Sequence, residues 1–376
     1  MKFLSKEKIN NKRVIVRCDF NVPIKNGVIL DNSKILKSLK TIKYLLDNNN
    51  QLILLSHFGR VKSVEDFDKN SLLPVYEELK KHIEVVFSDN PKDIDVDILK
   101  NKCILLENTR FNDIPEKTES NNDLELAKYY SSLADVFVFD AFGTSHRLHS
   151  STAGISNFLP TYIGFLVEEE IKKLEILFKD NAGLVAIMGG AKVDDKISVI
   201  KSLILKCDKI ILTGGILNSF LKQKGFNTGK SLISENEEVN KSIIELLENY
   251  SDKFLFSDKF VTEDNKTISI SEMNDNDKIC DNVIITNDTL KNAKTIFING
   301  TPGMYEDSFD LGTKSLFEIL VSCNADVIVG GGDTASAALK YASEKDFYYI
   351  SSGGGATLEY IADNKIKVFE YFKSNK

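Results

Sequence analysis

Two lysines in the segment MGGAKVDDKISVI, residues 188–200, are the first candidates for chemistry in this chain. Two glycines end an apolar run, and Lys192 and Lys196 follow, four residues apart, at the start of an expected helix. Free N–H groups at a helix start and two ammonium groups on one face would attract a polyanion. A solvated pair of surface lysines is the alternative that this segment alone leaves open.

A second set of polar side chains follows the apolar runs in the first half of the chain. The segments RCDFN, SHFGR, ENTRF and DAFGTSHR supply Asp19, Asn21, His57, Arg60, Arg110 and Arg147. Arginine binds phosphate and carboxylate groups through a planar fork, so this set suits a small anion that carries both. A single arginine at a strand end is usually just solvated, and His57 and His146 could each be buried core histidines. Four such segments in equivalent positions favour a binding site.

The second half of the chain offers glycines at the equivalent positions. The segments GGAK, TGG, NGTPG, GGGDT and SSGGGA follow its apolar runs. Glycine lets the backbone come close to phosphates and to a base, so these turns suit a nucleotide. Asp333 in GGGDT either caps a helix or holds Mg²⁺ on a nucleotide phosphate, and the adjacent Thr334 favours the metal role.

The elements that position these residues alternate between short apolar runs and helical patterns, which predicts α/β units around parallel sheets. Ligands bind beyond the carboxyl ends of the strands in such sheets. We expect two open α/β domains of similar size, with EEEIKKLEILF (168–178) as a connecting helix. The predicted strands are residues 14–16, 51–56, 103–106, 136–139, 184–188, 209–213, 295–298, 326–329 and 347–351.

Composition restricts the class of protein. The chain has 376 residues, 42% of them hydrophobic and 27% charged, which is typical of a soluble globular protein with two cores. A net charge of −7 and a pI near 5.4 argue against nucleic-acid binding. Five scattered cysteines without CxxC spacing indicate reduced thiols, and no signal peptide or membrane span is expected. We therefore expect a cytoplasmic protein.

Nine motifs together resemble the phosphoglycerate kinase family from about residue 13 to 361. They are VRCDFNVP, SHFGR, ENTRF, DAFGTSHRLHSST, GGAKVDDKI, GGILNSFL, NGTPGMYE, GGGDTASA and SSGGGATLE. The resemblance implies two Rossmann-like domains, each a parallel sheet flanked by helices, joined by a helical hinge. We expect a phosphoglycerate-binding domain over 1–165, the hinge over 166–180 and a nucleotide-binding domain over 181–360. Residues 361–376 are expected to return to the first domain.

The resemblance also implies an activity and its partners. Members of the family transfer a phosphoryl group between 1,3-bisphosphoglycerate and ADP, giving 3-phosphoglycerate and MgATP in glycolysis. The implied co-substrates are therefore ADP and ATP, with Mg²⁺ as the cofactor. A monomer is expected.

Site residues are carried over from the matching motifs. Lys192 resembles the lysine that steadies the transferring phosphoryl group, and Lys34 stands where the family has an arginine that reaches it. Glu306 resembles the ribose-binding glutamate, and Asp333 the metal ligand. The implied phosphoglycerate site comprises Asp19, Asn21, Lys34, His57, Phe58, Gly59, Arg60, Arg110 and Arg147. The implied nucleotide site comprises Gly190, Ala191, Lys196, Gly214, Gly215, Asn299, Glu306, Gly331, Gly332, Asp333, Thr334, Gly353 and Gly354.

Several positions depart from the family pattern. Lys34 keeps the charge of the usual arginine but loses its fork, which is not a conservative change at a bidentate contact. Thr213 replaces the first glycine of a Gly-Gly-Gly turn, and Thr301-Pro302 stands where Pro-Val is usual. The family's Asp-x-Gly-Pro segment is not recognisable in residues 281–289.

Three interpretations remain open on the sequence alone. The first is a working phosphoglycerate kinase, and the second is a related acyl-phosphate kinase with another acid or nucleotide. The third is a non-catalytic ligand-binding protein on the same fold.

Overall fold

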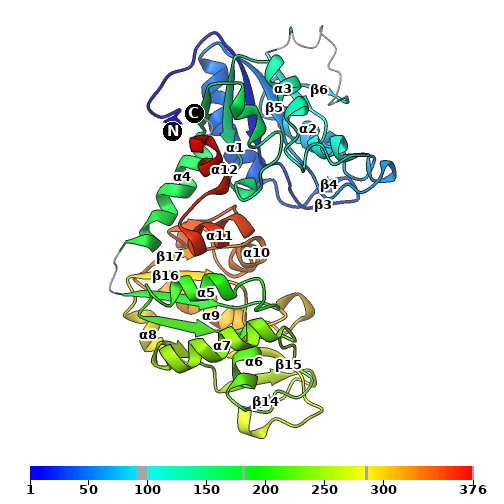
Figure 1. Cartoon of the computed structure of the whole chain (residues 1–376). Helices are drawn as coiled ribbons and strands as arrows, with labels where there is room; N and C mark the ends of the chain where they lie inside the picture. Colours follow the sequence, from blue (N-terminus) through cyan, green and yellow to red (C-terminus); the bar gives the residue numbers. More distant parts are fainter. Residues whose placement is uncertain (91–99, 101, 180–182, 284–286, 375–376) are drawn as a thin grey trace. The chain divides into compact units, whose positions relative to one another are not determined.

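The computed structural model of the chain describes residues 1–90, 100, 102–179, 183–283 and 287–374 (Figure 1). It divides into two compact units. Unit 1 comprises Met1–Lys172 with Lys365–Lys376, and unit 2 comprises Lys173–Asn364. The domain limits expected from the motifs stay a prediction. Residues 180–182 near the expected hinge, 284–286 of the divergent 281–289 stretch, and 375–376 lie outside the described residues.

Unit 1 is built on a seven-stranded parallel sheet. Its strand order is β1 (Lys2–Phe3), β9 (Thr161–Ile163), β8 (Val136–Asp140), β2 (Arg13–Cys18), β5 (Gln51–Leu55), β7 (Cys103–Leu106) and β6 (Val86–Ser88). The four central strands are almost entirely buried. Near-continuous apolar runs are what a parallel sheet with both faces covered requires. A short hairpin, β3 (Ile24–Lys25) and β4 (Val28–Ile29), precedes the first long helix.

Helices cover both faces of this sheet. On one face, Ile35 and Leu39 of α1 (Ser33–Asp47) share a core with Val14 and Val16 of β2. The other helices of unit 1 are α2 (Leu73–Leu79), α3 (Leu124–Ser132), α12 (Lys367–Ser374) and most of α4 (Phe165–Leu174).

The opposite face is closed by α12, near the end of the chain. Phe372 packs edge-on against Phe137 and Phe139 of β8, with ring centroids 6.4 and 5.9 Å apart. The backbone N–H of Val368 donates to the carbonyl of Ser145 over 3.1 Å. The end of the chain therefore completes a core begun by residues more than two hundred positions earlier.

Unit 2 repeats this architecture with six parallel strands. Their order is β12 (Phe254–Leu255), β11 (Lys209–Leu212), β10 (Leu184–Met188), β16 (Thr295–Asn299), β17 (Asp326–Val329) and β18 (Tyr349–Ile350). Its helices are α5 (Ile197–Leu203), α6 (Gly214–Gln223), α7 (Glu237–Tyr250), α8 (Asn287–Lys291), α9 (Leu311–Ser322), α10 (Gly332–Tyr341) and α11 (Gly355–Asp363). A small antiparallel sheet is added, with β13 (Lys259–Thr262) between β14 (Thr267–Ile268) and β15 (Ile279–Val283).

The predicted fold class is confirmed: two parallel sheets, each flanked by helices. Each of the nine ranges predicted as strands overlaps a strand of the structure, although the last strand covers only Tyr349–Ile350. The connecting helix begins earlier than expected, at Phe165, and passes at Glu175 into a 3₁₀ turn, Glu175–Phe178. None of the helices within the described ranges has the length and apolar character needed to cross a membrane.

One local prediction is wrong. Lys192 does not lie on a helix with Lys196, because α5 begins only at Ile197. Residues 189–196 form a loop in which the N–H groups of Lys196 and Ile197 both donate to the carbonyl of Val193. The Lys196 ammonium turns back to the carbonyl of Gly189 instead of projecting along a helix face. The two lysines therefore do not form a pair on one helical face.

Candidate functional site

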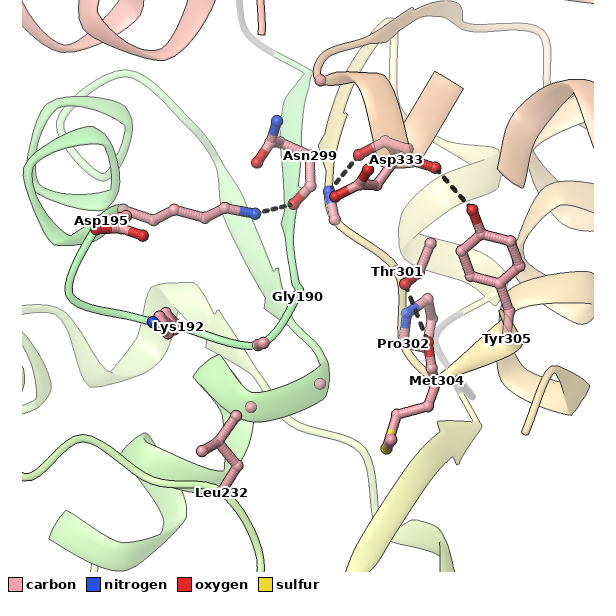
Figure 2. A pocket seen from close by; sticks show the side chains of 18 of the residues that line it. Gly190, Lys192, Asp195, Leu232, Asn299, Thr301, Pro302, Met304, Tyr305 and Asp333 are labelled. Carbon is pink, nitrogen blue, oxygen red and sulfur yellow. Dashed lines mark hydrogen bonds between the residues drawn. The ribbon is translucent and has the colours of Figure 1, made fainter. Parts of the chain in front are cut away.

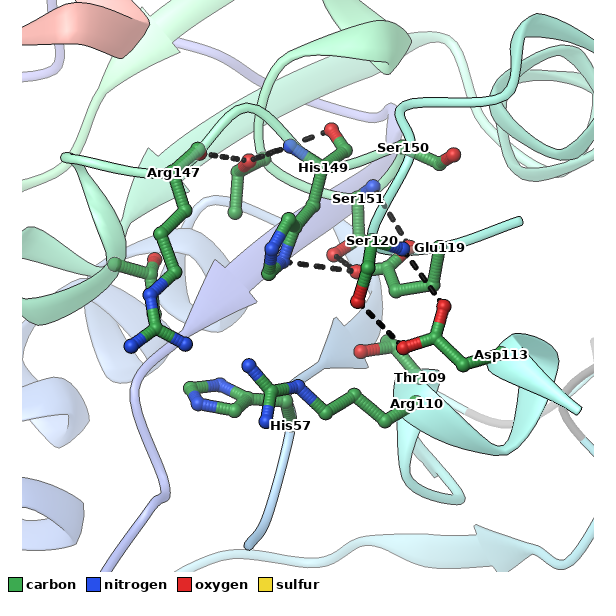
Figure 3. A network of polar contacts seen from close by, with 12 residues as sticks. His57, Thr109, Arg110, Asp113, Glu119, Ser120, Arg147, His149, Ser150 and Ser151 are labelled. Carbon is green, nitrogen blue, oxygen red and sulfur yellow. Dashed lines mark hydrogen bonds and ion pairs between the residues drawn. The ribbon is translucent and has the colours of Figure 1, made fainter. Parts of the chain in front are cut away.

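The polar residues of unit 1 gather at one edge of its sheet. Asp19 follows β2, His57 follows β5, Arg110 lies in the 3₁₀ turn after β7, and Arg147 follows β8. The carboxyl ends of parallel strands share one edge, so four separate segments meet there. Figure 3 shows His57, Arg110 and Arg147 turned toward one another.

Lys34, from the first turn of α1, reaches the same edge. Its Nζ donates to Asp19 Oδ2 over 2.9 Å, with the lysine side chain 26% exposed and the aspartate 6% exposed. The α1 helix therefore delivers one ammonium group to the strand ends.

The turn after β5 is tied to its neighbours by the backbone of Gly59. Its N–H donates to Asn21 Oδ1 over 3.0 Å, and its carbonyl accepts from Arg110 Nη1 over 2.7 Å. Its φ of +61° is left-handed, and a Cβ here would meet Asn70 Oδ1 at 2.3 Å. Both facts favour glycine at this position.

Phe58 and Arg60 flank that glycine and differ in exposure. The N–H of Phe58 donates to Asn108 Oδ1 over 3.2 Å, and its side chain is half-buried. Arg60 accepts a hydrogen bond from Asn70 Nδ2 through its carbonyl, while its side chain is exposed. The structure thus fixes the backbone of Arg60 beside the site and leaves its guanidinium accessible to a ligand.

A buried network beneath these residues was missed from the sequence. Arg17, within β2, is fully buried, and its Nε donates to Ser151 Oγ over 2.9 Å. The Ser151 hydroxyl donates in turn to Glu119 Oε1, and the Ser151 N–H donates to Glu119 Oε2 over 3.1 Å. A charged residue inside the otherwise apolar run VIVRC was the available signal, because a buried charge needs a partner. Figure 3 shows Glu119 and Ser151 beside His149, whose Nδ1 lies 3.9 Å from Glu119 Oε1.

Two histidines at this edge, His57 and His149, are held neutral. Burial lowers the pKa of His57 well below its usual value, and the positive charges of Arg17, Arg110 and Arg147 lower it further. Burial together with the same arginines lowers the pKa of His149 to about 3. The positive charge of this edge therefore comes from guanidinium and ammonium groups.

In unit 2, the glycine-rich turns surround one cavity of about 630 Å³ (Figure 2). That size falls within the roughly 300–1,000 Å³ of small-molecule sites. Lys192 and every predicted nucleotide-side residue except Gly353 line it. Gly353 instead donates its N–H to Ser351 Oγ over 3.2 Å. Gly190, Gly214 and Gly331 have φ of +94°, +56° and +95°, values that favour glycine.

Lys196 is fixed at the floor of this cavity. Its Nζ donates to the carbonyl of Gly189 over 2.6 Å and to that of Asn299 over 3.3 Å. Burial lowers its pKa to about 8, while the charges of Asp333 and Asp195 act in the opposite direction. Lys192, in contrast, is exposed in the loop before α5.

Asp333 and Thr334 lie in the first turn of α10, on the opposite wall. Gly331, not Asp333, is the N-cap, and no side-chain cap is formed, so the capping role considered for Asp333 is absent. Its carboxylate is exposed on the cavity wall. Thr334 Oγ1 accepts from the N–H of Gly300 over 2.7 Å.

One carboxylate on the wall fits a nucleotide-borne Mg²⁺. Magnesium usually takes one or two protein carboxylates and completes its shell with phosphates and water. The part of the chain that the structure describes contains no cluster of three or more His, Cys, Asp or Glu residues able to hold a metal alone. Asp333 therefore suits a metal that arrives with a phosphate ligand.

The rest of the cavity wall was not predicted. It includes apolar side chains from the α6–α7 connection, β15 and α11: Leu232, Ile279, Cys280 and Leu358. Asn218 of α6 and Met304 of the NGTPGM turn join them. No motif marks these positions, because any apolar side chain of suitable size can cover the face of a planar ring.

Comparisons with known proteins agree on one family. The sequence model described as Phosphoglycerate kinase matches residues 4–364. The phosphoglycerate kinase of Finegoldia magna is 41% identical over 376 residues, covering 94% of each chain. That of Enterococcus faecalis is 42% identical over 374 residues, covering 93% of this chain and 94% of the other. The solved phosphoglycerate kinase from Coxiella burnetii has a TM-score of 0.83 at 32% identity, covering 99% of this chain and 98% of that one.

Proposed function

Because the chain belongs to the phosphoglycerate kinase family, we propose that it transfers a phosphoryl group reversibly between 1,3-bisphosphoglycerate and ADP. The products are 3-phosphoglycerate and MgATP, and the role is glycolytic. The observation that carries the proposal is the unit 2 cavity, in which glycine backbone, Lys196 and Asp333 face one space of about 630 Å³.

The phosphoglycerate binds at the strand ends of unit 1. Arg110, Arg147 and Arg60 hold its phosphate and carboxylate, because guanidinium forks match both groups. His57, Asp19 and Asn21 bind its remaining polar atoms, with Phe58 and Gly59 shaping the turn around it. The support is their assembly at one sheet edge.

The nucleotide binds in the unit 2 cavity. Its phosphates lie against the turns at Gly190–Ala191 and Gly331–Gly332, with Lys196 as their fixed positive partner. Glu306 binds the ribose. Asp333 holds the Mg²⁺, which when bound offsets phosphate charge, and Thr334 supplies a hydroxyl beside it. The turns at Gly214–Gly215, Asn299 and Gly354 complete the walls.

The reaction needs no strong base. A carboxylate oxygen of 3-phosphoglycerate attacks the γ-phosphoryl group in line, and ADP attacks the acyl phosphate in reverse. Catalysis consists of positioning and charge neutralisation in a water-poor site. Lys192 and Lys34 carry the charge of the phosphoryl group in transfer. Because the two sites belong to different units, the reaction requires a conformation in which the bound ligands meet, reached about the hinge proposed over residues 166–180.

We also propose that the protein acts as a cytoplasmic monomer, without nucleic-acid or membrane partners. All five cysteines are free, which suits a reducing compartment. Its net charge of −7 disfavours polyanionic surfaces.

A coupled assay with purified protein, 3-phosphoglycerate and MgATP tests the proposed function. Turnover that depends on both substrates is expected. Turnover with another carboxylic acid but not with 3-phosphoglycerate would contradict it and identify a related acyl-phosphate kinase. Ligand binding by calorimetry without any turnover would identify a binding protein instead.

A further inference from the structure

His57 and Arg17 form a contact whose chemistry allows one arrangement of protons. Arg17 Nη2 lies 3.2 Å from His57 Nδ1, and both side chains are buried, with exposed fractions of 0% and 6%. A guanidinium group has only donors and stays protonated at any pH of interest. The Nδ1 atom must therefore be the acceptor, which places the one ring proton on Nε2.

The guanidinium is itself held by two further hydrogen bonds. Its Nε donates to Ser151 Oγ over 2.9 Å, and its Nη1 donates to the carbonyl of Cys18. Ser151 links it to the fully buried carboxylate of Glu119, which supplies the balancing negative charge. Arg17 therefore cannot turn away from His57 without leaving its other donors unpaired.

Protonation of His57 would break this arrangement. A proton on Nδ1 would face the N–H of the guanidinium, so two donors and two positive charges would meet in a buried site. The charged or titratable groups that act on the ring come from β2, the turn after β7 and the loop after β8. They are Arg17, Arg110, His149 and Arg147. Three of them are permanent cations, and each disfavours an imidazolium ion.

We propose that Arg17 is a positioning residue that fixes His57 as the neutral Nε2–H tautomer, so that the ring offers its site an uncharged N–H donor. This proposal rests on the anion site proposed above. A neutral donor binds a phosphate or carboxylate oxygen with the same strength at every pH where the ring stays neutral. The permanent charges of the arginines then carry the electrostatic attraction. Arg17 acts without touching the substrate.

Nitrogen NMR of the ligand-free protein tests the tautomer directly. The chain has four histidines, so a His57→Gln spectrum assigns the His57 signals by subtraction. Between pH 5.5 and 8.5, we expect a protonated Nε2, an unprotonated Nδ1 and no titration step. A proton on Nδ1, or an imidazolium ion at pH 6.5, would overturn the proposal. A scalar coupling between Arg17 Nη2 and His57 Nδ1 in the unaltered protein would identify the donor.

The variant Arg17→Lys tests whether Arg17 positions the His57 ring or only supports the surrounding structure. Lysine keeps the charge but cannot hold Ser151, Cys18 and His57 at once. We expect a mixture of His57 tautomers or a titration step between pH 5.5 and 8, with a KM for 3-phosphoglycerate that rises several-fold with pH relative to the unaltered protein. The KM ratio between the two proteins cancels the substrate's own phosphate ionisation. A variant spectrum that still shows only the Nε2–H tautomer would remove Arg17 from this role.

Arg13→Lys is the matched control, because Arg13 begins the same strand and its Nη1 donates to the carbonyl of Leu133 instead. It should leave the His57 signals and the KM ratio unchanged. If Arg17→Lys does not fold, the coupling in the unaltered protein decides the proposal: its presence supports Arg17 as the donor, and its absence contradicts it. If the unaltered protein shows the expected tautomer but no activity, only the proposed function is refuted. If it is active but lacks the expected tautomer, only the positioning role of Arg17 is refuted.

Discussion

Lys34 Nζ donates to Asp19 Oδ2 over 2.9 Å, so an ammonium group from α1 is joined to the carboxylate that directly follows β2. The ammonium group has three donors, and this bond uses one of them. A guanidinium at the same place would hold Asp19 with one side of its fork and keep further N–H groups for a phosphoryl oxygen.

Lys34→Arg should therefore preserve or raise kcat in the coupled assay. The gain would come from a second directed donor to the transferring phosphoryl group, since the charge itself does not change. Lys34→Met, which removes the charge, serves as the comparison and should lower kcat by roughly 10²-fold or more. A large loss in the arginine variant would show that the site has been rebuilt around lysine.

Lys192→Ala should collapse kcat while changing substrate affinities far less. Lys192 is exposed in the loop before α5, so its removal leaves no buried partner unpaired. Its proposed role is confined to the phosphoryl group in transfer, and interactions of that kind appear in kcat. Steady-state kinetics with both substrates checks this. Lys201→Ala, on the exposed side of α5, is the control, and normal turnover by the Lys192 variant would exclude the lysine from catalysis.

Nucleotide affinity should fall as pH rises from 7 to 9.5. Burial lowers the pKa of Lys196 to about 8, so the free protein loses this charge within that range. Bound phosphates favour the charged form, and ADP binding should take up a proton near pH 8–9. Calorimetry in buffers of different ionisation enthalpy measures that uptake. Lys196→Met should bind ADP weakly and without the uptake; an unchanged uptake would place the titrating group elsewhere.

Thr213→Val should raise the free energy of unfolding by about 1 kcal/mol, because a buried hydroxyl without a partner is costly. Thr213 Oγ1 is fully buried and has no hydrogen-bond partner among the described residues. Thr334→Val is the matched control, since it removes the acceptor of the Gly300 N–H and should lower stability. Denaturant unfolding compares the two. A loss of stability in the Thr213 variant would mean that its hydroxyl binds water or ligand.

Asp140→Asn should weaken the pH dependence of stability between pH 4 and 7. Burial raises the pKa of Asp140 from 3.8 to about 6, so the folded state holds a proton that the unfolded chain has lost. Stability from this group is complete below pH 4 and is lost as pH rises through 6, by about 3 kcal/mol at most. Asparagine keeps the Oδ1 acceptor for the N–H groups of Leu166 and Val167.

Unfolding curves at pH 4.5 and 7.5 test this difference. Asp281, whose pKa burial also raises to about 6, lies in unit 2, so Asp281→Asn provides an independent second case. Equal pH dependence in Asp140→Asn and the unaltered protein would show that the carboxylate is already ionised in the folded state at pH 4.5.

The central strands were predictable because parallel strands covered on both faces need unbroken apolar runs. The runs at 103–106 and 184–188 coincide with β7 and β10 residue for residue. The strands β1, β6, β9 and β12, which lie at or next to the sheet edges, have only two or three residues each, which is too short for a periodicity to appear. The antiparallel sheet around β13 was missed for another reason: its strands KFVT and ICDNV mix polar with apolar residues and contain no unbroken apolar run.

The residues of the candidate site also fall into those that the sequence could predict and those that it could not. Residues that follow long strands, such as His57 and Asp333, could be placed at a sheet edge from order alone. Glu119, in contrast, is joined to the site through Ser151, some thirty residues away in the chain, and no local pattern marks that pairing. The expected helix through Lys192 failed because the Lys196 ammonium binds loop carbonyls that a continuous helix would not offer.

The return of α12 to unit 1 has a consequence for the order of folding during synthesis. Unit 2 is one uninterrupted segment, Lys173–Asn364, and the ribosome makes all of it before α12. When all residues of unit 2 have been synthesised, Phe137 and Phe139 of unit 1 still lack their packing partner Phe372. We expect unit 2 to fold first on the nascent chain, and unit 1 to complete its core only when Phe369 and Phe372 of α12 have been synthesised.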